Sequence, residues 1–388
     1  MRAARLVIAT VLLVGIVAAA IFTALAPELP PAGSESARRL AVGPLAVASL
    51  DRRFVDRSRP TAANGDFAGA PERTLATTIW YPEGAPGPHP LLVYSHGFMS
   101  MRGENAPLLD MLASHGYVAV SIDYPLTNRS APGGPNVADA VNQPGDIRFV
   151  IDQLLGMPES ERPFAGGIDA DRIGALGLSL GGLTTELVSF HPKLRDPRIH
   201  AAISIAGPTA MFDERFFASA DLPFLMIGGT ADAMIGFEEN AAPVPRKVAH
   251  SGLLAIRGAT HVGFGAFADG FPLRFVRNPD ALGCRMLLRN LEKLDGANPL
   301  AGLGGAEEGV VLGSSFQLPC QKTITERALA AGRQLMITRL AALAFFESWF
   351  AADPAERAAQ ATYLAETLPR DFPEARYERG TAVVSSSN

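Results

Sequence analysis

The stretch Gly177-Leu178-Ser179-Leu180-Gly181-Gly182 constrains the fold of this chain more than any other. It follows a short apolar run at 172–176 and precedes a helix-like run at 183–190. A strand, a sharp Gly-x-Ser-x-Gly turn and a helix make a nucleophile elbow, a turn so tight that the flanking glycines must lack side chains. The pattern predicts that Ser179 is a nucleophile held above a sheet edge at the positive end of a helix. An ordinary glycine-rich turn is the alternative interpretation.

A serine nucleophile needs a base to take its proton, and the base needs an acid that orients it. After such an elbow the acid and then the histidine follow along the chain. Asp232 comes just after an apolar run, whereas the rival acids Asp213 and Asp221 precede that run. His261 directly follows the next apolar run. We therefore predict that Asp232 orients His261, which takes the proton from Ser179; a surface turn aspartate and a surface loop histidine are the alternatives.

The tetrahedral intermediate of such a reaction needs hydrogen-bond donors for its oxyanion. The backbone N–H of Leu180, immediately after the nucleophile, is one candidate. The other is the N–H of Phe98, in the loop 95–100. His96 in the same loop is interpreted as a brace for the loop, not as a metal ligand. Because no residues have metal-ligand spacing and no phosphate loop or dinucleotide fingerprint occurs, we expect neither a metal nor another cofactor.

The remaining apolar runs predict an α/β fold with a mostly parallel, eight-stranded sheet covered by helices on both faces. The runs lack alternation, as expected of strands buried on both sides. The predicted strands lie at 45–50, 75–81, 90–95, 117–122, 172–176, 201–205, 223–228 and 253–256. The predicted helices lie at 106–114, 146–155, 183–190, 282–294, 327–350 and 354–368.

Four motifs occur together in this chain: Ser95-His96-Gly97, the stretch 143–152, the elbow, and the pair Asp232 and His261. Together they resemble the dienelactone-hydrolase-like α/β-hydrolases, over residues 42–267. In particular they resemble the branch that contains bacterial relatives of platelet-activating-factor acetylhydrolase, and more distantly the secreted polyester hydrolases. The resemblance implies an α/β-hydrolase fold and acyl-transfer chemistry.

The chain differs from the acetylhydrolases in the position of its acid and from the dienelactone hydrolases in its nucleophile. In the acetylhydrolases the acid follows the sixth strand, where this chain has Gly207-Pro208. This departure favours Asp232 and the arrangement of the dienelactone hydrolases. Those enzymes use a cysteine nucleophile, however, so Ser179 indicates esterase chemistry instead.

The ends of the chain differ in composition from the centre. Arg2 and Arg5 precede 21 uncharged residues, 6–26, which as a helix would be about 31 Å long and would cross a bilayer core. We interpret 1–26 as a membrane anchor or a signal peptide. The protein would then be exported, either anchored on the outer, periplasmic face of the cytoplasmic membrane or secreted. Residues 27–40 are predicted to be a linker, and 378–388 a disordered tail.

Residues 41–377 would form the hydrolase domain. Within it the glycine-rich segment 263–323 is predicted to be an insertion, either a lid or a flank of the core. Cys284 and Cys320, the two cysteines, would pair in an oxidising compartment, or would be unrelated buried thiols. The net charge of −5, without a long basic run, argues against a nucleic-acid partner. Oligomeric state stays open.

Apolar residues near the predicted catalytic positions suggest a pocket for an acyl or aryl group, with core packing as the alternative. The candidates are Phe98, Met99, Phe212, Ile235 and Phe264. The leading hypothesis is an exported serine esterase or lipase acting on small-molecule, lipid or polyester-like esters. Two alternatives remain: an envelope acyltransferase, and a non-catalytic binding protein on a hydrolase fold.

Overall fold

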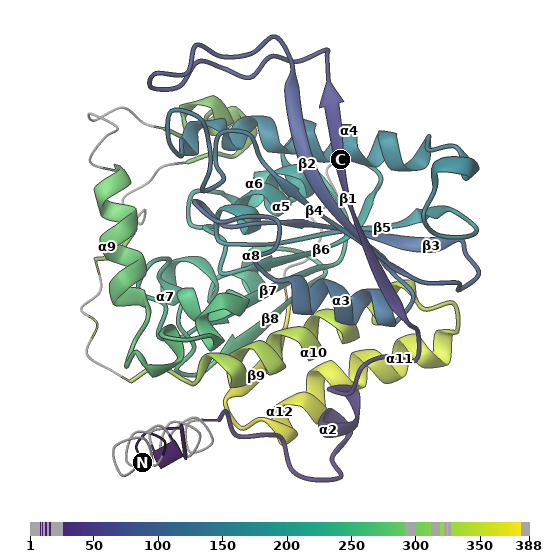
Figure 1. The fold of residues 1–388 in the computed structure, drawn as a ribbon, viewed down its shortest axis with the longest axis vertical. Coiled ribbons are helices and arrows are strands. Elements are labelled where there is room, and N and C mark those ends of the chain that lie inside the picture. Colours follow the sequence, from purple (N-terminus) through teal and green to yellow (C-terminus); the bar gives the residue numbers. More distant parts are fainter. Residues whose placement is uncertain are drawn as a thin grey trace.

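The computed structural model describes residues 8, 10, 12, 13, 15, 16, 26–291, 299–311, 319–321, 324 and 327–381. In this part of the chain nine strands form one sheet, in the order β1-β2-β4-β3-β5-β6-β7-β8-β9 (Figure 1). The strands are β1 (Val47–Asp56), β2 (Arg73–Pro82), β3 (His89–Ser95), β4 (Val118–Asp123), β5 (Ile168–Leu178), β6 (Ile199–Ile205), β7 (Phe224–Gly229), β8 (Ser251–Ile256) and β9 (Ala375–Arg379).

Helices cover both faces of this sheet (Figure 1). The α-helices of the described residues are α2 (Glu35–Arg39), α3 (Ala106–Ser114), α4 (Gln143–Leu155), α5 (Leu180–Phe190), α6 (Glu214–Phe217), α7 (Phe237–Asn240), α8 (Val244–Lys247), α9 (Asp280–Leu291), α10 (Ala331–Phe350), α11 (Pro354–Thr362) and α12 (Leu368–Asp371). Alternate side chains of β3 divide the core between the faces. Leu91 and Val93 pack with α4, whereas Leu92 and Tyr94 pack with α3 and α10.

The sheet is mixed. Strands β3 to β8 run parallel, while β1, β2 and β9 pair antiparallel with their neighbours. All eight predicted strands are present, so the predicted α/β-hydrolase architecture is confirmed in outline. The prediction missed β9, because the sequence Ala375-Arg376-Tyr377-Glu378-Arg379 has no apolar run. Residues 378 and 379 therefore belong to a strand and not to the predicted tail, and 382–388 lie outside the described residues.

The predicted linker 27–40 contains a packed helix, α2. Ser34 caps this helix by accepting the N–H of Ala37 at 3.1 Å. The side chain of Ser36 is fully buried, 2.8 Å from the hydroxyl of Tyr363, and its N–H donates to Asp371 at 3.1 Å. Because these contacts fix the helix against the C-terminal helices, residues 35–39 are part of the folded domain.

The predicted membrane segment 1–26 falls almost entirely outside the described residues. Within the described ranges, no helix combines the length and the apolar character needed to cross a membrane. The insertion 263–323 is described except for 292–298, 312–318, 322 and 323. Its main element is α9, at left in Figure 1, which a disulfide joins through Cys284 to Cys320.

Candidate active site

The candidate nucleophile lies at the junction between β5 and α5. Ser179 has φ 58° and ψ −115°, a backbone conformation that non-glycine residues adopt only under strain. A Cβ at Gly177 would come within 2.2 Å of the carbonyl oxygen of Gly181, and a Cβ at Gly181 within 1.9 Å of that of Ser95. The two glycines are therefore required by the close approach of three backbone segments, which is the geometry of a nucleophile elbow.

The candidate acid and base extend from neighbouring strands. Asp232 follows β7 and His261 follows β8, and both are almost fully buried. The Nδ1–H of His261 donates to Oδ2 of Asp232 over 2.8 Å, while Oδ1 of Asp232 accepts the N–H groups of Met234 and Ile235 at 2.9 and 2.7 Å. With Nδ1 as donor, Nε2 is the atom that accepts a proton. Ser179 and His261 border the same cavity.

The surroundings of His261 favour its charged form. Burial of the ring acts to lower its pKa, but the carboxylate of Asp232, by charge and hydrogen bond, outweighs this effect. Asp280 and Glu104 add further negative charge. The net result is a pKa of His261 above its usual 6.5. The site thus holds a basic imidazole, as proton transfer from a serine hydroxyl requires.

The rival acids have other roles. Asp213 caps α6 by accepting the N–H groups of Arg215 and Phe216, and Asp221 lies 3.3 Å from Nε2 of His250.

The predicted oxyanion donors are free: neither the N–H of Phe98 nor that of Leu180 makes a hydrogen bond within the described ranges.

His96 braces the loop that carries Phe98. Its Nδ1–H donates to the carbonyl of Gly97 at 2.8 Å, and its Nε2 accepts the N–H of Tyr124 at 3.3 Å. Both ring nitrogens are therefore used within the fold. Among the described residues, no group of three or more His, Cys, Asp or Glu side chains is arranged to hold a metal ion.

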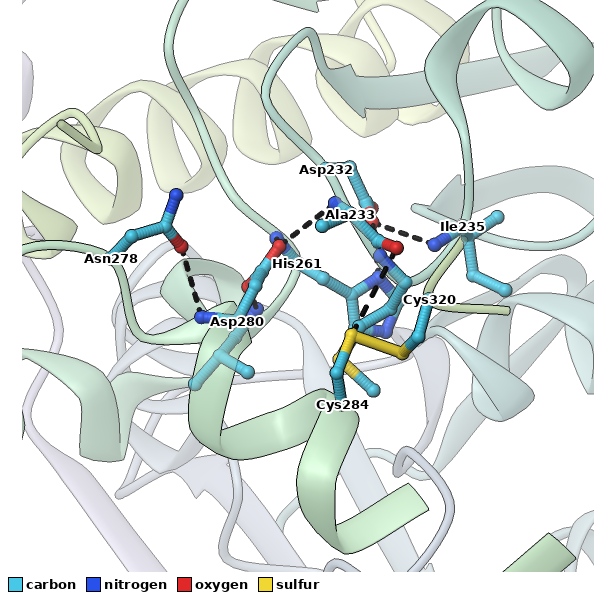
Figure 2. Close-up of a disulfide and its surroundings, with 10 residues drawn as sticks. Asp232, Ala233, Ile235, His261, Asn278, Asp280, Cys284 and Cys320 are labelled. Carbon is cyan, nitrogen blue, oxygen red and sulfur yellow. Dashed lines mark hydrogen bonds and ion pairs between the residues drawn. A yellow bond between two sulfur atoms is a disulfide. The ribbon is translucent and has the colours of Figure 1, made fainter. Parts of the chain in front are cut away.

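Two carboxylates of this site, Glu104 and Asp280, were not predicted from the sequence. Oε2 of Glu104 accepts the N–H of Gly97 at 3.0 Å and the hydroxyl of Tyr94 at 2.6 Å. Asp280, the first residue of α9, accepts the N–H of Ala233, which follows Asp232, and the N–H of His261 itself (Figure 2). Neither acid has a motif around it in the sequence. Asp280 acts on loops 19 and 47 positions away, whereas Glu104 acts on a loop seven positions before it.

The cavity beside Ser179 has a volume of about 920 Å³. Of the predicted pocket residues, Phe98 and Met99 border it, and Ile235 does not. Phe212 and Phe264 are wrong predictions: both are buried in the core, Phe212 stacked on Phe216 with ring centres 3.8 Å apart. The apolar lining comes largely from the insertion 263–323 instead, together with the loops after β3 and β7. These residues are Met101, Met234, Phe267, Leu273, Leu282, Met286 and Leu287.

Helix α9 forms one wall of the cavity, and Asn290 on this helix donates through Nδ2 to the sulfur of Met99 at 3.2 Å. The sequence predicted this helix but not which side of the domain it would cover. Three arginines, Arg102, Arg129 and Arg285, also border the cavity. Arg102 is paired with Asp51 and Asp123. The site therefore combines an apolar interior with a partly charged rim.

The chain is similar to known ester hydrolases. A family model described as PET hydrolase-like matches residues 58–268. Cutinase 2 of Thermobifida cellulosilytica is 27% identical over 228 residues, which span 55% of this chain and 77% of the cutinase. Cutinase cut1 of Thermobifida fusca is 26% identical over 228 residues, spanning 55% of this chain and 63% of the relative.

A solved structure, the ferulic acid esterase from Streptomyces cinnamoneus, shares the fold. Its TM-score is 0.55 at 22% sequence identity, and the match covers 88% of this chain and 98% of that chain. The family model covers more than half of the chain and includes both Ser179 and His261. The chain therefore belongs to the PET hydrolase-like family, and is a carboxylic ester hydrolase with the α/β-hydrolase fold.

Proposed function

We propose that this protein is a serine hydrolase that cleaves esters of apolar acids or alcohols through an acyl-enzyme. The observation that carries the proposal is the 2.8 Å hydrogen bond between His261 and Asp232, together with the position of His261 and Ser179 on one largely apolar cavity. Lipid, short-chain and polyester-like esters fit this lining by their chemistry.

The reaction begins when the hydroxyl of Ser179 attacks the ester carbonyl carbon while Nε2 of His261 takes its proton. Asp232 stabilises the resulting imidazolium through its bond to Nδ1. The N–H groups of Phe98 and Leu180 donate to the oxyanion. His261 then gives the proton to the leaving alcohol, and an ester between Ser179 and the acyl group remains.

In the second half of the reaction, water replaces the alcohol. His261 removes a proton from the water as it attacks the acyl carbon. Collapse of the second tetrahedral intermediate releases the carboxylic acid and returns the proton to Ser179. No metal or other cofactor has a step in this sequence.

We also propose that the protein works outside the cytoplasm. Support comes from the disulfide between Cys284 and Cys320, since structural disulfides persist mainly in oxidising compartments. The uncharged stretch 6–26, which follows Arg2 and Arg5, has the pattern of a segment that directs export. Fractionation of cells that express the full chain tests this: recovery of the mature protein in the cytoplasm would contradict it.

The test of the activity is hydrolysis of p-nitrophenyl acetate, butyrate and octanoate by the full chain. Ser179→Ala is expected to lower kcat about 10⁴-fold or more, because no other group supplies the nucleophile. A fluorophosphonate probe should label the wild type and not this variant. Full activity in folded Ser179→Ala would refute the proposal, and absence of labelling in the wild type would favour a non-catalytic binding protein.

An envelope acyltransferase would use the same residues but pass the acyl group to a sugar or lipid hydroxyl. The two reactions separate by product analysis in the presence of glycerol as acceptor. Release of free acid as the main product supports the hydrolase. Transfer of most acyl groups to glycerol at a low glycerol concentration would instead favour the acyltransferase.

A further inference from the structure

A single buried carboxylate contacts both loops that carry the candidate acid and base. Oδ2 of Asp280 accepts the N–H of Ala233 and the N–H of His261, each at 3.0 Å. Oδ1 accepts the N–H of Val262 at 2.8 Å. The side chain is fully buried. Figure 2 shows Asp280 facing the segment of Ala233 and His261.

These contacts add to hydrogen bonds that already join the two loops: the N–H of Ala231 donates to the carbonyl of Ala259 at 3.0 Å, and the N–H of Gly258 donates to Oγ1 of Thr230 at 3.0 Å. Ala233 is the neighbour of Asp232 and follows β7, while His261 and Val262 follow β8. Parallel strands place both loops at the same edge of the sheet, but do not fix how the two loops face each other. Loss of the carboxylate would leave three N–H groups without their acceptor in a buried place, so the loops would have to rearrange.

Asp280 is itself firmly placed. Its N–H donates to Oδ1 of Asn278 at 3.1 Å. One turn further along α9, Cys284 forms the disulfide to Cys320 and its sulfur lies 3.9 Å from the carbonyl of Ala233. A Cβ at Gly283 would lie only 2.6 Å from a methyl carbon of Val262. Helix α9 thus packs closely against the loops that Asp280 holds.

We propose that Asp280 is a positioning residue of the active site, whose carboxylate holds the loops of Asp232 and His261 in the arrangement that joins the two side chains. The inference rests on the proposed serine mechanism and adds a residue to it. It also assigns a role to the start of α9. The helix is a fixed wall of the cavity, because an outward swing of its first turn would break all three bonds to the loops.

The charge of Asp280 adds a second effect on His261. The ionisable groups that face the imidazole are Asp232 from the loop after β7, Asp280 from α9 and Glu104 from the loop before α3. Asp51, Arg102, Arg129 and Arg285 border the same cavity. Removal of the negative charge at position 280 should therefore lower the pKa of His261 and make the free base available at lower pH.

The pKa of Asp280 lies above its usual value, because burial and the nearby carboxylate of Asp232 raise it more than His261 and the N–H donors of Ala233 and Val262 lower it. All three bonds to its side chain come from N–H donors, which favour the ionised form. The isosteric Asp280→Asn variant removes the charge and replaces one acceptor by a donor, so it tests both effects in one step.

The experiment compares the full-length wild type, Asp280→Asn and Asp280→Glu with p-nitrophenyl butyrate over pH 5–9. Asp280→Asn should lower kcat about 10- to 100-fold with little change in KM, and shift the acid limb of kcat/KM to lower pH. Asp280→Glu keeps the charge, so its acid limb should stay near that of the wild type while kcat recovers in part. Asp213→Asn, which alters a carboxylate at the start of α6, is the matched control and should behave as the wild type.

A folded Asp280→Asn variant with the kcat and the acid limb of the wild type would overturn the inference. If this variant does not fold, Asp280→Glu decides: a lowered kcat at unchanged KM and unchanged acid limb supports the inference, and a wild-type kcat overturns it. Ser179→Ala distinguishes failure of the serine mechanism from failure of the role of Asp280. Retained activity in that variant refutes the serine mechanism itself, whereas its inactivity together with a wild-type-like Asp280→Asn refutes only the role of Asp280.

Discussion

Oε2 of Glu104 accepts the N–H of Gly97 at 3.0 Å, one residue before the predicted oxyanion donor Phe98. The same oxygen accepts the hydroxyl of Tyr94, to which Asn105 also donates at 2.7 Å. Asn105 in turn accepts the N–H of Ala266, shortly after His261. One buried polar cluster thus connects the loop of the oxyanion donor with the segment that follows the candidate base.

Glu104→Ala should lower kcat about 10- to 100-fold, because the Gly97 N–H loses its acceptor and the loop of Phe98 shifts. KM should change less, since the apolar lining is kept. Steady-state kinetics with p-nitrophenyl butyrate give both numbers. Glu83→Ala removes an exposed acid and serves as the control. Equal kcat values for Glu104→Ala and the wild type would show that the loop does not need this support.

The pH profile of the wild type should report His261. Its pKa is raised above 6.5 by Asp232, Asp280 and Glu104, against the lowering effect of burial. The catalytic base must be unprotonated, so kcat/KM should rise as pH increases and reach half of its maximum above pH 6.5. Initial rates between pH 5 and 9 measure this midpoint. A midpoint clearly below 6.5 would contradict the assignment of His261 as the base.

Two phenylalanines three residues apart should respond differently to replacement by alanine. Phe264 is fully buried in the core, so Phe264→Ala should cost about 3–5 kcal/mol of unfolding free energy. Phe267 is half exposed and borders the cavity. Phe267→Ala should leave the Tm nearly unchanged and raise KM for aryl esters about fivefold. Thermal melts and steady-state kinetics of both variants measure these two effects. A raised KM in Phe264→Ala with an unchanged Tm would instead support the prediction that Phe264 lines the pocket.

Reduction of the disulfide between Cys284 and Cys320 should destabilise the insertion 263–323. The two residues are 36 positions apart, and chain-entropy arguments assign such a link about 3–4 kcal/mol. The wild type should therefore unfold at lower denaturant concentration when a phosphine reductant is present. Cys284→Ser/Cys320→Ser should match the reduced wild type and be insensitive to the reductant. An unchanged midpoint would mean that packing alone fixes α9.

Glu186 on α5 should make the stability depend on pH. Burial raises its pKa to about 8, although the hydroxyl of Ser204 donates to it at 2.7 Å and Lys247 lies near. Between the ordinary pKa of 4.5 and about 8 the folded chain keeps a proton that the unfolded chain loses, so stability falls as pH rises.

The variant Glu186→Gln cannot titrate, and therefore lacks this dependence. From pH 5.5 to 8, its unfolding free energy should gain about 3 kcal/mol relative to that of the wild type. Denaturant unfolding at the two pH values measures the change. Parallel pH dependence in both proteins would show that Glu186 is ionised in the folded state.

The sequence was sufficient to locate candidate residues wherever these are marked by a short local pattern. The turn around Ser179 is defined by glycines two residues away on either side, and Asp232 and His261 each follow a clear apolar run, so local patterns located all three. The role of each in catalysis stays a prediction. Long-range contacts were beyond such reasoning: Asp280 touches His261 across 19 positions, and no local pattern distinguishes it from other aspartates.

Burial was equally hard to predict for single aromatic residues. Phe212 directly precedes the rival acid Asp213, and Phe264 follows the candidate base His261 by three positions. Both are buried in the core, while Phe267 borders the cavity. Apolar character is the same in each case, and only the packing of α10 and α6 against these loops separates them. The polar strand β9 was missed for a related reason, since its pairing with β8 depends on backbone hydrogen bonds and not on an apolar run.

The docking of α2 has a practical consequence for any shortened version of the protein. Besides the bonds of Ser36 to Tyr363 and Asp371, the guanidinium of Arg39 lies 3.9 Å from the ring centre of Tyr363. Removal of everything before residue 41 would uncover these C-terminal groups and take from Asp371 the N–H that Ser36 donates to it. An expression fragment that begins upstream of Ser34 keeps the contacts between α2 and the C-terminal helices.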